Sequence, residues 1–133
     1  MTTLVSPNAD CEIEFDILKE YEEFVAKSAL WNTALGGQNP TPAQRAQQRL
    51  SHYLGLAEES GEVLGVCKKS MCGNWSAEKT REQLVKELGD VLWYLTAVCL
   101  DAGIPLGEVI KTNVEKLNDR KKRGTIHGSG SDR

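Results

Sequence analysis

The chain has 133 residues, of which 40% are hydrophobic and 26% are charged, and its formal net charge is −3. These values are typical of one soluble domain with a buried core, and the slight acidic excess argues against a protein that binds duplex nucleic acid. The sequence contains no run of 18 apolar residues, no signal-peptide pattern and no C-x-x-C cysteine pair. We therefore expect a cytoplasmic protein with no membrane partner.

Helical periodicity begins after a loose N-terminal arm at residues 1–11. The first predicted helix runs from Glu12 to about Leu35 and is followed by two glycines and a proline, which end helices. A second helix is predicted from Pro42 to about Ser70, with Thr41 as its N-cap.

A third helix is predicted after Ser76, its N-cap, and it ends at Gly103. A fourth opens at Pro105 and continues through Leu117. No segment alternates with the period of a strand. We assign residues 12–121 to one domain and residues 122–133 to a basic, glycine-rich tail.

The predicted fold is all-α, with about four helices in an antiparallel bundle. The second helix carries apolar or small residues on two opposite sides, so a single layer of neighbours does not cover it. Oligomerisation is therefore expected to complete the bundle, and helices from a second copy would supply the missing contacts.

The second and third helices each carry a pair of acids three residues apart, Glu59 with Glu62 and Glu87 with Asp90. This spacing projects both carboxylates of a pair from one side of a helix. Antiparallel packing would bring all four together, where they repel unless a hard divalent cation is bound. We predict that these four residues bind Mg²⁺, with Mn²⁺ as a substitute. From the residues alone, the alternative to a metal site is that each acidic pair lies on a solvated helix face.

The same residues carry a resemblance to a known family. Glu58-Glu59-x-x-Glu62, followed after 24 residues by Glu87-x-x-Asp90, resembles the EExxE…ExxD signature of the all-α nucleoside triphosphate pyrophosphohydrolases, specifically the MazG-like group. The resemblance covers residues 12–133. It includes a helix that carries Asn, Lys and Arg residues and the glycine-rich tail that follows this helix. The tail has the sequence GSGSD where the group usually has GSGD, so the resemblance is weaker in the tail.

The resemblance implies a magnesium-dependent enzyme that hydrolyses a (d)NTP between its α and β phosphates, giving (d)NMP and pyrophosphate, and so clears or recycles nucleotides. It implies that Glu59 orients the attacking water, with Glu58 as the alternative, and that the protein is a homodimer or homotetramer. Alternative functions are a dUTPase-like or phosphoribosyl-ATP-like pyrophosphohydrolase, an alarmone hydrolase, and a non-catalytic helical module for oligomerisation or binding.

Further residues are expected to contact the substrate. Asn113, Lys116 and Arg120 share one helix face and would hold the β and γ phosphates. Aromatic residues of the family stack on the base, and we assign Trp31 and Tyr94 to substrate binding. For Trp93 we expect core or interface packing. His52 is expected to be a structural histidine.

Overall fold

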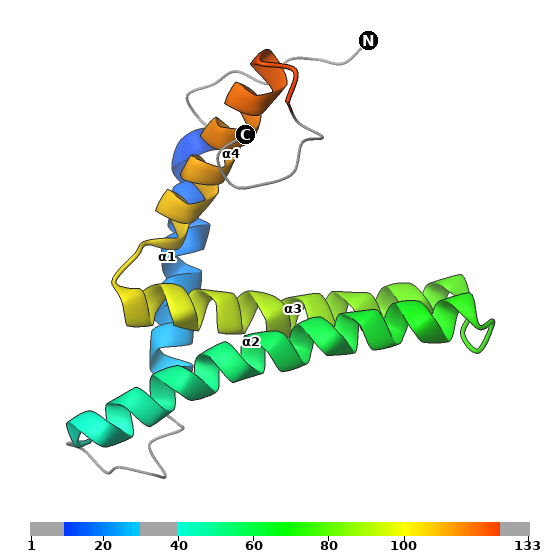
Figure 1. Cartoon of the computed structure of the whole chain (residues 1–133), viewed down its shortest axis with the longest axis horizontal. Helices are drawn as coiled ribbons and strands as arrows, with labels where there is room; N and C mark the ends of the chain where they lie inside the picture. Colours follow the sequence, from blue (N-terminus) through cyan, green and yellow to red (C-terminus); the bar gives the residue numbers. More distant parts are fainter. Residues whose placement is uncertain (1–9, 30–39, 126–133) are drawn as a thin grey trace.

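The computed structural model describes residues 10–29 and 40–125, and the side chains of residues 10–16 are outside that description. Within these ranges the structure contains helices and no strand, which confirms the predicted all-α fold (Figure 1). The helices are α1 (Asp10–Ala29), α2 (Pro42–Met71), α3 (Ala77–Ala102) and α4 (Leu106–Lys122). Helix α1 begins within the predicted N-terminal arm. The rest of that arm, the predicted end of the first helix and most of the predicted tail lie outside the described residues.

The ends of α2 and α3 follow from their capping residues. Thr41 and Gln44 form a capping box, in which the Gln44 N–H donates to the Thr41 hydroxyl and the Thr41 N–H donates to the Gln44 amide oxygen. Ser76 accepts a hydrogen bond from the Lys79 N–H at the start of α3. Gly103 ends α3 with a φ of 68°, a left-handed conformation that glycine adopts without steric cost.

Helix α4 takes its N-terminal cap from α1. Pro105, at the N-cap position, makes no side-chain hydrogen bond, and the N–H of Leu106 donates to the carboxylate of Glu22. A carboxylate at a helix N-terminus satisfies a free N–H and complements the helix dipole. This contact joins residues far apart in the sequence and holds the start of α4 against α1.

The helices form two antiparallel pairs, as Figure 1 shows. Helices α2 and α3 make a long hairpin, and α1 and α4 lie side by side across the end where α3 finishes. The chain turns by 102° between α3 and α4. No single helix in the described ranges is long and apolar enough to cross a membrane, and only the bent pair α3–α4 passes that test by length and composition.

Close packing within the α2–α3 hairpin depends on Gly55. A Cβ built on Gly55 would overlap the ring of Tyr94, which lies directly against the α2 backbone. At Gly61, by contrast, an added Cβ would have no neighbour within 4 Å.

We expect Gly55→Ala to destabilise the protein by about 1–3 kcal/mol, because the new methyl group must displace Tyr94 from a packed position. The matched control is Gly61→Ala, which we expect to be neutral or to stabilise by about 0.5–1 kcal/mol, since alanine is the better helix former. Urea unfolding followed by circular dichroism measures both changes. Equal effects of the two substitutions would show that the Gly55–Tyr94 contact does not limit packing.

Candidate metal centre and adjoining cavity

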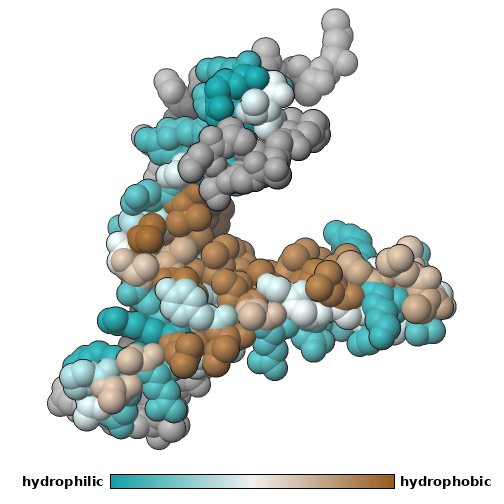
Figure 2. All heavy atoms as spheres, in the orientation of Figure 1, coloured by the Kyte–Doolittle hydropathy of each residue, from teal (hydrophilic) through white to brown (hydrophobic). Residues whose placement is uncertain are grey.

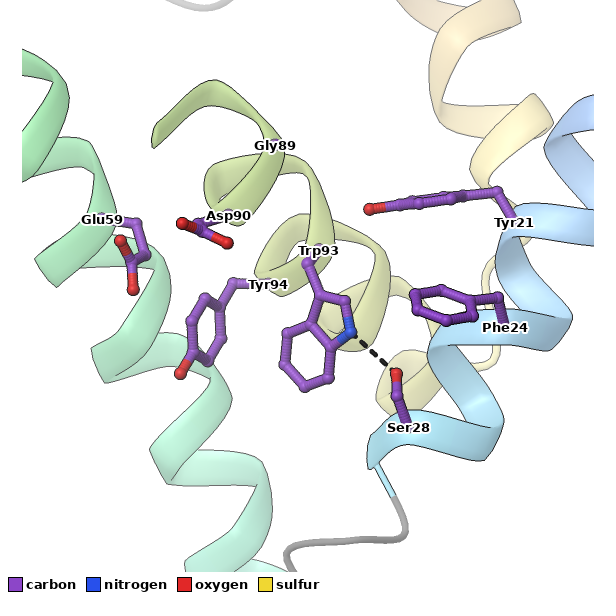
Figure 3. A pocket seen from close by; sticks show the side chains of 8 residues that line it. All are labelled: Tyr21, Phe24, Ser28, Glu59, Gly89, Asp90, Trp93 and Tyr94. Atoms are coloured by element: carbon purple, nitrogen blue, oxygen red, sulfur yellow. Dashed lines mark hydrogen bonds between the residues drawn. The ribbon is translucent and has the colours of Figure 1, made fainter. Parts of the chain in front are cut away.

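Three of the predicted acidic residues meet at the seam between α2 and α3. Glu59 from α2 and Glu87 and Asp90 from α3 each offer a carboxylate oxygen, and these oxygens lie within 4.8 Å of one another. Figure 3 shows Glu59 and Asp90 projecting from facing helices toward the same space. The antiparallel hairpin produces this arrangement, because the acids of both helices then face each other at one level.

The fourth predicted ligand, Glu62, lies outside this group of three. It is exposed, and one of its oxygens lies 3.9 Å from where a Cβ on Gly65 would be. Glu58, the alternative catalytic residue, is also exposed. Both Glu62 and Glu58 still act on Glu59 through their charges.

The electrostatics of the centre favour a bound cation. The pKa of Glu59 is raised, first by burial and then by the charges of its acidic neighbours, of which Asp90 has the largest effect. Burial and the charges of Glu59, Glu58 and Asp90 also raise the pKa of Tyr94. Within the described ranges, no lysine or arginine forms an ion pair with Glu59, Glu87 or Asp90. A cluster of oxygen ligands without a protein counter-charge fits a hard divalent ion such as Mg²⁺ or Mn²⁺.

A cavity of about 650 Å³ adjoins the carboxylates. Its volume lies within the range of roughly 300–1,000 Å³ found for small-molecule sites. Helix α2 contributes Glu59, α3 contributes one wall with Asp90, and α1 contributes the facing wall (Figure 3). The lining residues are Tyr21, Phe24, Ser28, Glu59, Gly89, Asp90, Trp93 and Tyr94.

Trp93 is only half-buried and forms part of this cavity wall, in addition to the packing expected for it. Its indole N–H donates a hydrogen bond of 2.8 Å to the Ser28 hydroxyl of α1. The ring lies edge-on to Tyr94, with centroids 4.9 Å apart. The predicted substrate residue Tyr94 therefore lines the cavity as part of a joined aromatic pair.

The predicted substrate residues of α4 are not brought to this cavity in the single chain. Asn113, Lys116 and Arg120 are on α4, which packs against α1, and none of them lines the cavity. Asn113 instead borders a separate apolar cavity of about 410 Å³ between α1, α3 and α4. Lys116 is exposed and Arg120 is buried. Trp31 lies outside the described residues.

The cavity wall formed by α1 was not foreseen from the sequence. Tyr21, Phe24 and Ser28 follow a helical repeat, and such a stripe is read as packing surface when no partner is known. Their only sequence signal is the aromatic and hydroxyl character of that stripe. The tertiary structure turns it toward the carboxylates.

Comparison with protein families then identifies the family of the chain. Residues 47–125 match the family model described as the MazG nucleotide pyrophosphohydrolase domain, which is more than half of the chain. The chain belongs to the MazG family. The matched region includes the carboxylates of α2 and α3 and the whole of α4, whereas the α1 wall of the cavity lies outside it.

A relative in this comparison comes from a bacteriophage. The chain is similar to the Gene 37 protein of Mycobacterium phage L5, with 37% identity over 82 residues, covering 60% of this chain and 72% of that protein. That name carries no functional information. No solved structure matches the chain. Family membership therefore rests on the sequence match.

We expect Mg²⁺ or Mn²⁺ to raise the melting temperature, because a cation that binds only the folded carboxylate cluster stabilises the folded state by mass action. Glu59→Gln should reduce this increase. In the presence of EDTA the same substitution should raise the melting temperature above that of the native protein, because it removes one of several repelling charges. Differential scanning fluorimetry with and without EDTA measures both effects.

The control for this experiment is Glu82→Gln. Glu82 is on the same helix as Glu87 and Asp90, but it is exposed and pairs with Lys79 and Lys86. Its substitution should leave the metal effect unchanged. Equal stabilisation by Mg²⁺ in native protein and Glu59→Gln would count against a metal centre at this seam.

Proposed function

We propose that this MazG-family chain is a Mg²⁺-dependent nucleoside triphosphate pyrophosphohydrolase. It converts a (d)NTP and water into a (d)NMP and pyrophosphate, and so clears or recycles nucleotides in the cytoplasm. The observation that carries the proposal is the meeting of Glu59, Glu87 and Asp90 beside a cavity large enough for a nucleotide. Family membership supports the same class of reaction.

The proposed roles follow from where the carboxylates lie. Glu59, Glu87 and Asp90 would hold Mg²⁺. Glu62, one turn further along α2, is proposed as a further ligand, and its charge already acts on Glu59. An ion held there would supply positive charge to neutralise the phosphate oxygens. Glu59 also orients the water that attacks the α phosphorus, with Glu58 as the alternative. The new P–O bond replaces the bond to the bridging oxygen, and pyrophosphate leaves.

The aromatic residues of the cavity give the nucleobase a place next to the carboxylates. Tyr94 and Trp93 form one side and Tyr21 and Phe24 the other (Figure 3). A base placed between such rings buries its flat faces against aromatic surface, which is favourable for any of the common bases. We accordingly propose that the cavity holds the base and sugar while the phosphates extend to the metal centre.

We further propose that the protein is a homodimer or homotetramer. Many large apolar side chains are exposed in the single chain, and Figure 2 shows apolar atoms at the surface along α3 and where α3 meets α1 and α4. Leu64 is 70% exposed and Leu54 is 61% exposed on α2, and Val85 is 60% exposed on α3. Apolar surface of this extent is typical of interaction sites. The predicted phosphate contacts of Asn113 and Lys116 would then be made in the assembled protein.

We expect the native protein to release pyrophosphate from at least one common NTP or dNTP in the presence of Mg²⁺, and to lose this activity in EDTA. Glu59→Gln should lower kcat by about a hundredfold or more, the usual loss when a preorganised charged group is removed from an active site. Glu82→Gln, outside the cluster, should retain native activity. A coupled assay for pyrophosphate across all common nucleotides measures these rates.

The substrate panel also includes dUTP, phosphoribosyl-ATP and guanosine tetraphosphate, which separates the alternative enzyme functions. Release of orthophosphate in place of pyrophosphate would show that the wrong bond has been assigned. A folded, Mg²⁺-binding protein that turns over no member of the panel would favour the non-catalytic module.

We expect multi-angle light scattering to give a mass at least twice that of one chain. Replacing Leu54 by Glu should shift the mass toward that of a monomer, because a charge at an apolar interface stays unpaired and desolvated. Glu82→Gln should keep the native mass. A monomeric native protein at micromolar concentration would contradict the proposed assembly.

A further inference from the structure

A hydrogen-bonded pair of side chains lies next to the cavity residue Trp93 and has no part in the proposed chemistry. His52 of α2 is 2% exposed, and its Nδ1 lies 2.7 Å from a carboxylate oxygen of Asp101 on α3. Because a carboxylate only accepts hydrogen bonds, Nδ1 must donate. The other ring nitrogen, Nε2, is buried and has no hydrogen-bond partner among the residues that the structure describes. Such an arrangement is costly if its only purpose is to fill the core.

The imidazole of His52 packs against Trp93. The two rings are close to perpendicular, at 83°, with their centroids 5.9 Å apart. Perpendicular rings at this distance interact favourably through the positive edge of one and the π face of the other. Asp101, which is on α3, accepts the hydrogen bond of Nδ1 and thereby fixes the orientation of the imidazole beside Trp93.

Trp93 is therefore held from two sides. His52 packs against its ring from α2, and Ser28 accepts its indole N–H from α1. The Ser28 hydroxyl in turn donates to the backbone carbonyl of Val25, 3.1 Å away. The hydroxyl thus has its proton directed away from the indole, which leaves its oxygen lone pairs for Trp93. A tryptophan that only filled space would not need its orientation set by polar groups from both neighbouring helices.

We propose that His52 and Asp101 are positioning residues, which fix the orientation of Trp93 so that its indole forms the wall against which the nucleobase binds. This proposal rests on the proposed function, because it assigns the cavity wall to the base of the same substrate. The ligand is an aromatic nucleobase. The pair acts on nucleotide binding and leaves the metal centre and the bond-breaking step unchanged.

A misplaced Trp93 should change KM. Stacking of a base on an aromatic ring depends on the position of that ring, whereas the triphosphate is held by the metal centre. An interaction made equally in the ground state and the transition state alters KM and leaves kcat unchanged. Misplacing Trp93 should therefore weaken binding of any ligand with a base, and should not affect a ligand made of phosphates alone.

The experiment compares Asp101→Leu with Asp101→Asn, two substitutions of similar size. Leucine removes the acceptor for His52 Nδ1, and asparagine keeps an oxygen acceptor. We expect Asp101→Leu to raise KM about tenfold, with kcat within about twofold of native, as expected when only uniform binding is lost. Asp101→Asn should restore KM to near the native value. The inhibition constant of inorganic tripolyphosphate, which has no base, should be the same in all three proteins.

Two further variants keep the test decisive if Asp101→Leu does not fold. Ser28→Ala removes the other contact that orients Trp93, and it should raise KM in the same way. The control is Thr96→Val, a nearly isosteric change at a fully buried position of α3, where the Thr96 hydroxyl donates to the Leu92 carbonyl. Thr96→Val should leave KM unchanged even if it lowers the melting temperature. Near-ultraviolet circular dichroism should change in Ser28→Ala and Asp101→Leu and not in Thr96→Val.

Calorimetric binding of nucleoside monophosphates, with Mg²⁺, separates the two proposals. If the native protein binds a monophosphate and the affinity falls about tenfold in Ser28→Ala and Asp101→Leu, the positioning role stands even where turnover is absent. Native KM and native monophosphate affinity in both variants would overturn the positioning role and leave the pyrophosphohydrolase intact. A native protein that binds no nucleotide would overturn both.

Discussion

The mutual repulsion of carboxylates at the α2–α3 seam is the constraint around which this structure is arranged. Glu59, Glu87 and Asp90 have carboxylate oxygens within 4.8 Å of one another, and burial together with the acidic neighbours of Glu59 raises its pKa. The hairpin tolerates this crowding because its helices are held together elsewhere, with the ring of Tyr94 packed against the bare backbone of Gly55. The hairpin therefore holds a cluster that a divalent cation would stabilise, beside a cavity that can admit a charged ligand.

Helix α1 supplies one wall of the cavity, although it lies outside the region that matches the MazG family. The family region alone supplies carboxylates and one aromatic wall. Tyr21, Phe24 and Ser28 close the opposite side, and Ser28 also bonds Trp93 across the gap. The acids thus belong to the part of the chain that matches the family, whereas three of the eight residues that line the cavity belong to the part that is not matched. Base preference is accordingly expected to depend on α1.

Helix α4 is directed away from the carboxylates by its first residue. The carboxylate of Glu22 caps the N–H of Leu106, and the chain turns by 102° between α3 and α4. The basic end of α4 is consequently separated from the acids in the same chain, and extensive apolar surface is left exposed. Both features agree with the proposed assembly, in which a second copy would cover the apolar faces.

Local sequence signals determined the helices, their capping residues and the acidic pairs. The caps at Thr41 and Ser76 and the stop at Gly103 depend only on nearby backbone geometry, and the three-residue spacing of acids depends only on helical pitch. Which acids meet was decided by the tertiary structure, because small differences in helix register and rotamer bring Glu87 into the cluster and leave Glu62 outside it. The same holds for the α1 wall and for the contact of His52 with Asp101, which join residues from separate helices. No periodicity along one helix specifies which residue of another helix it will face.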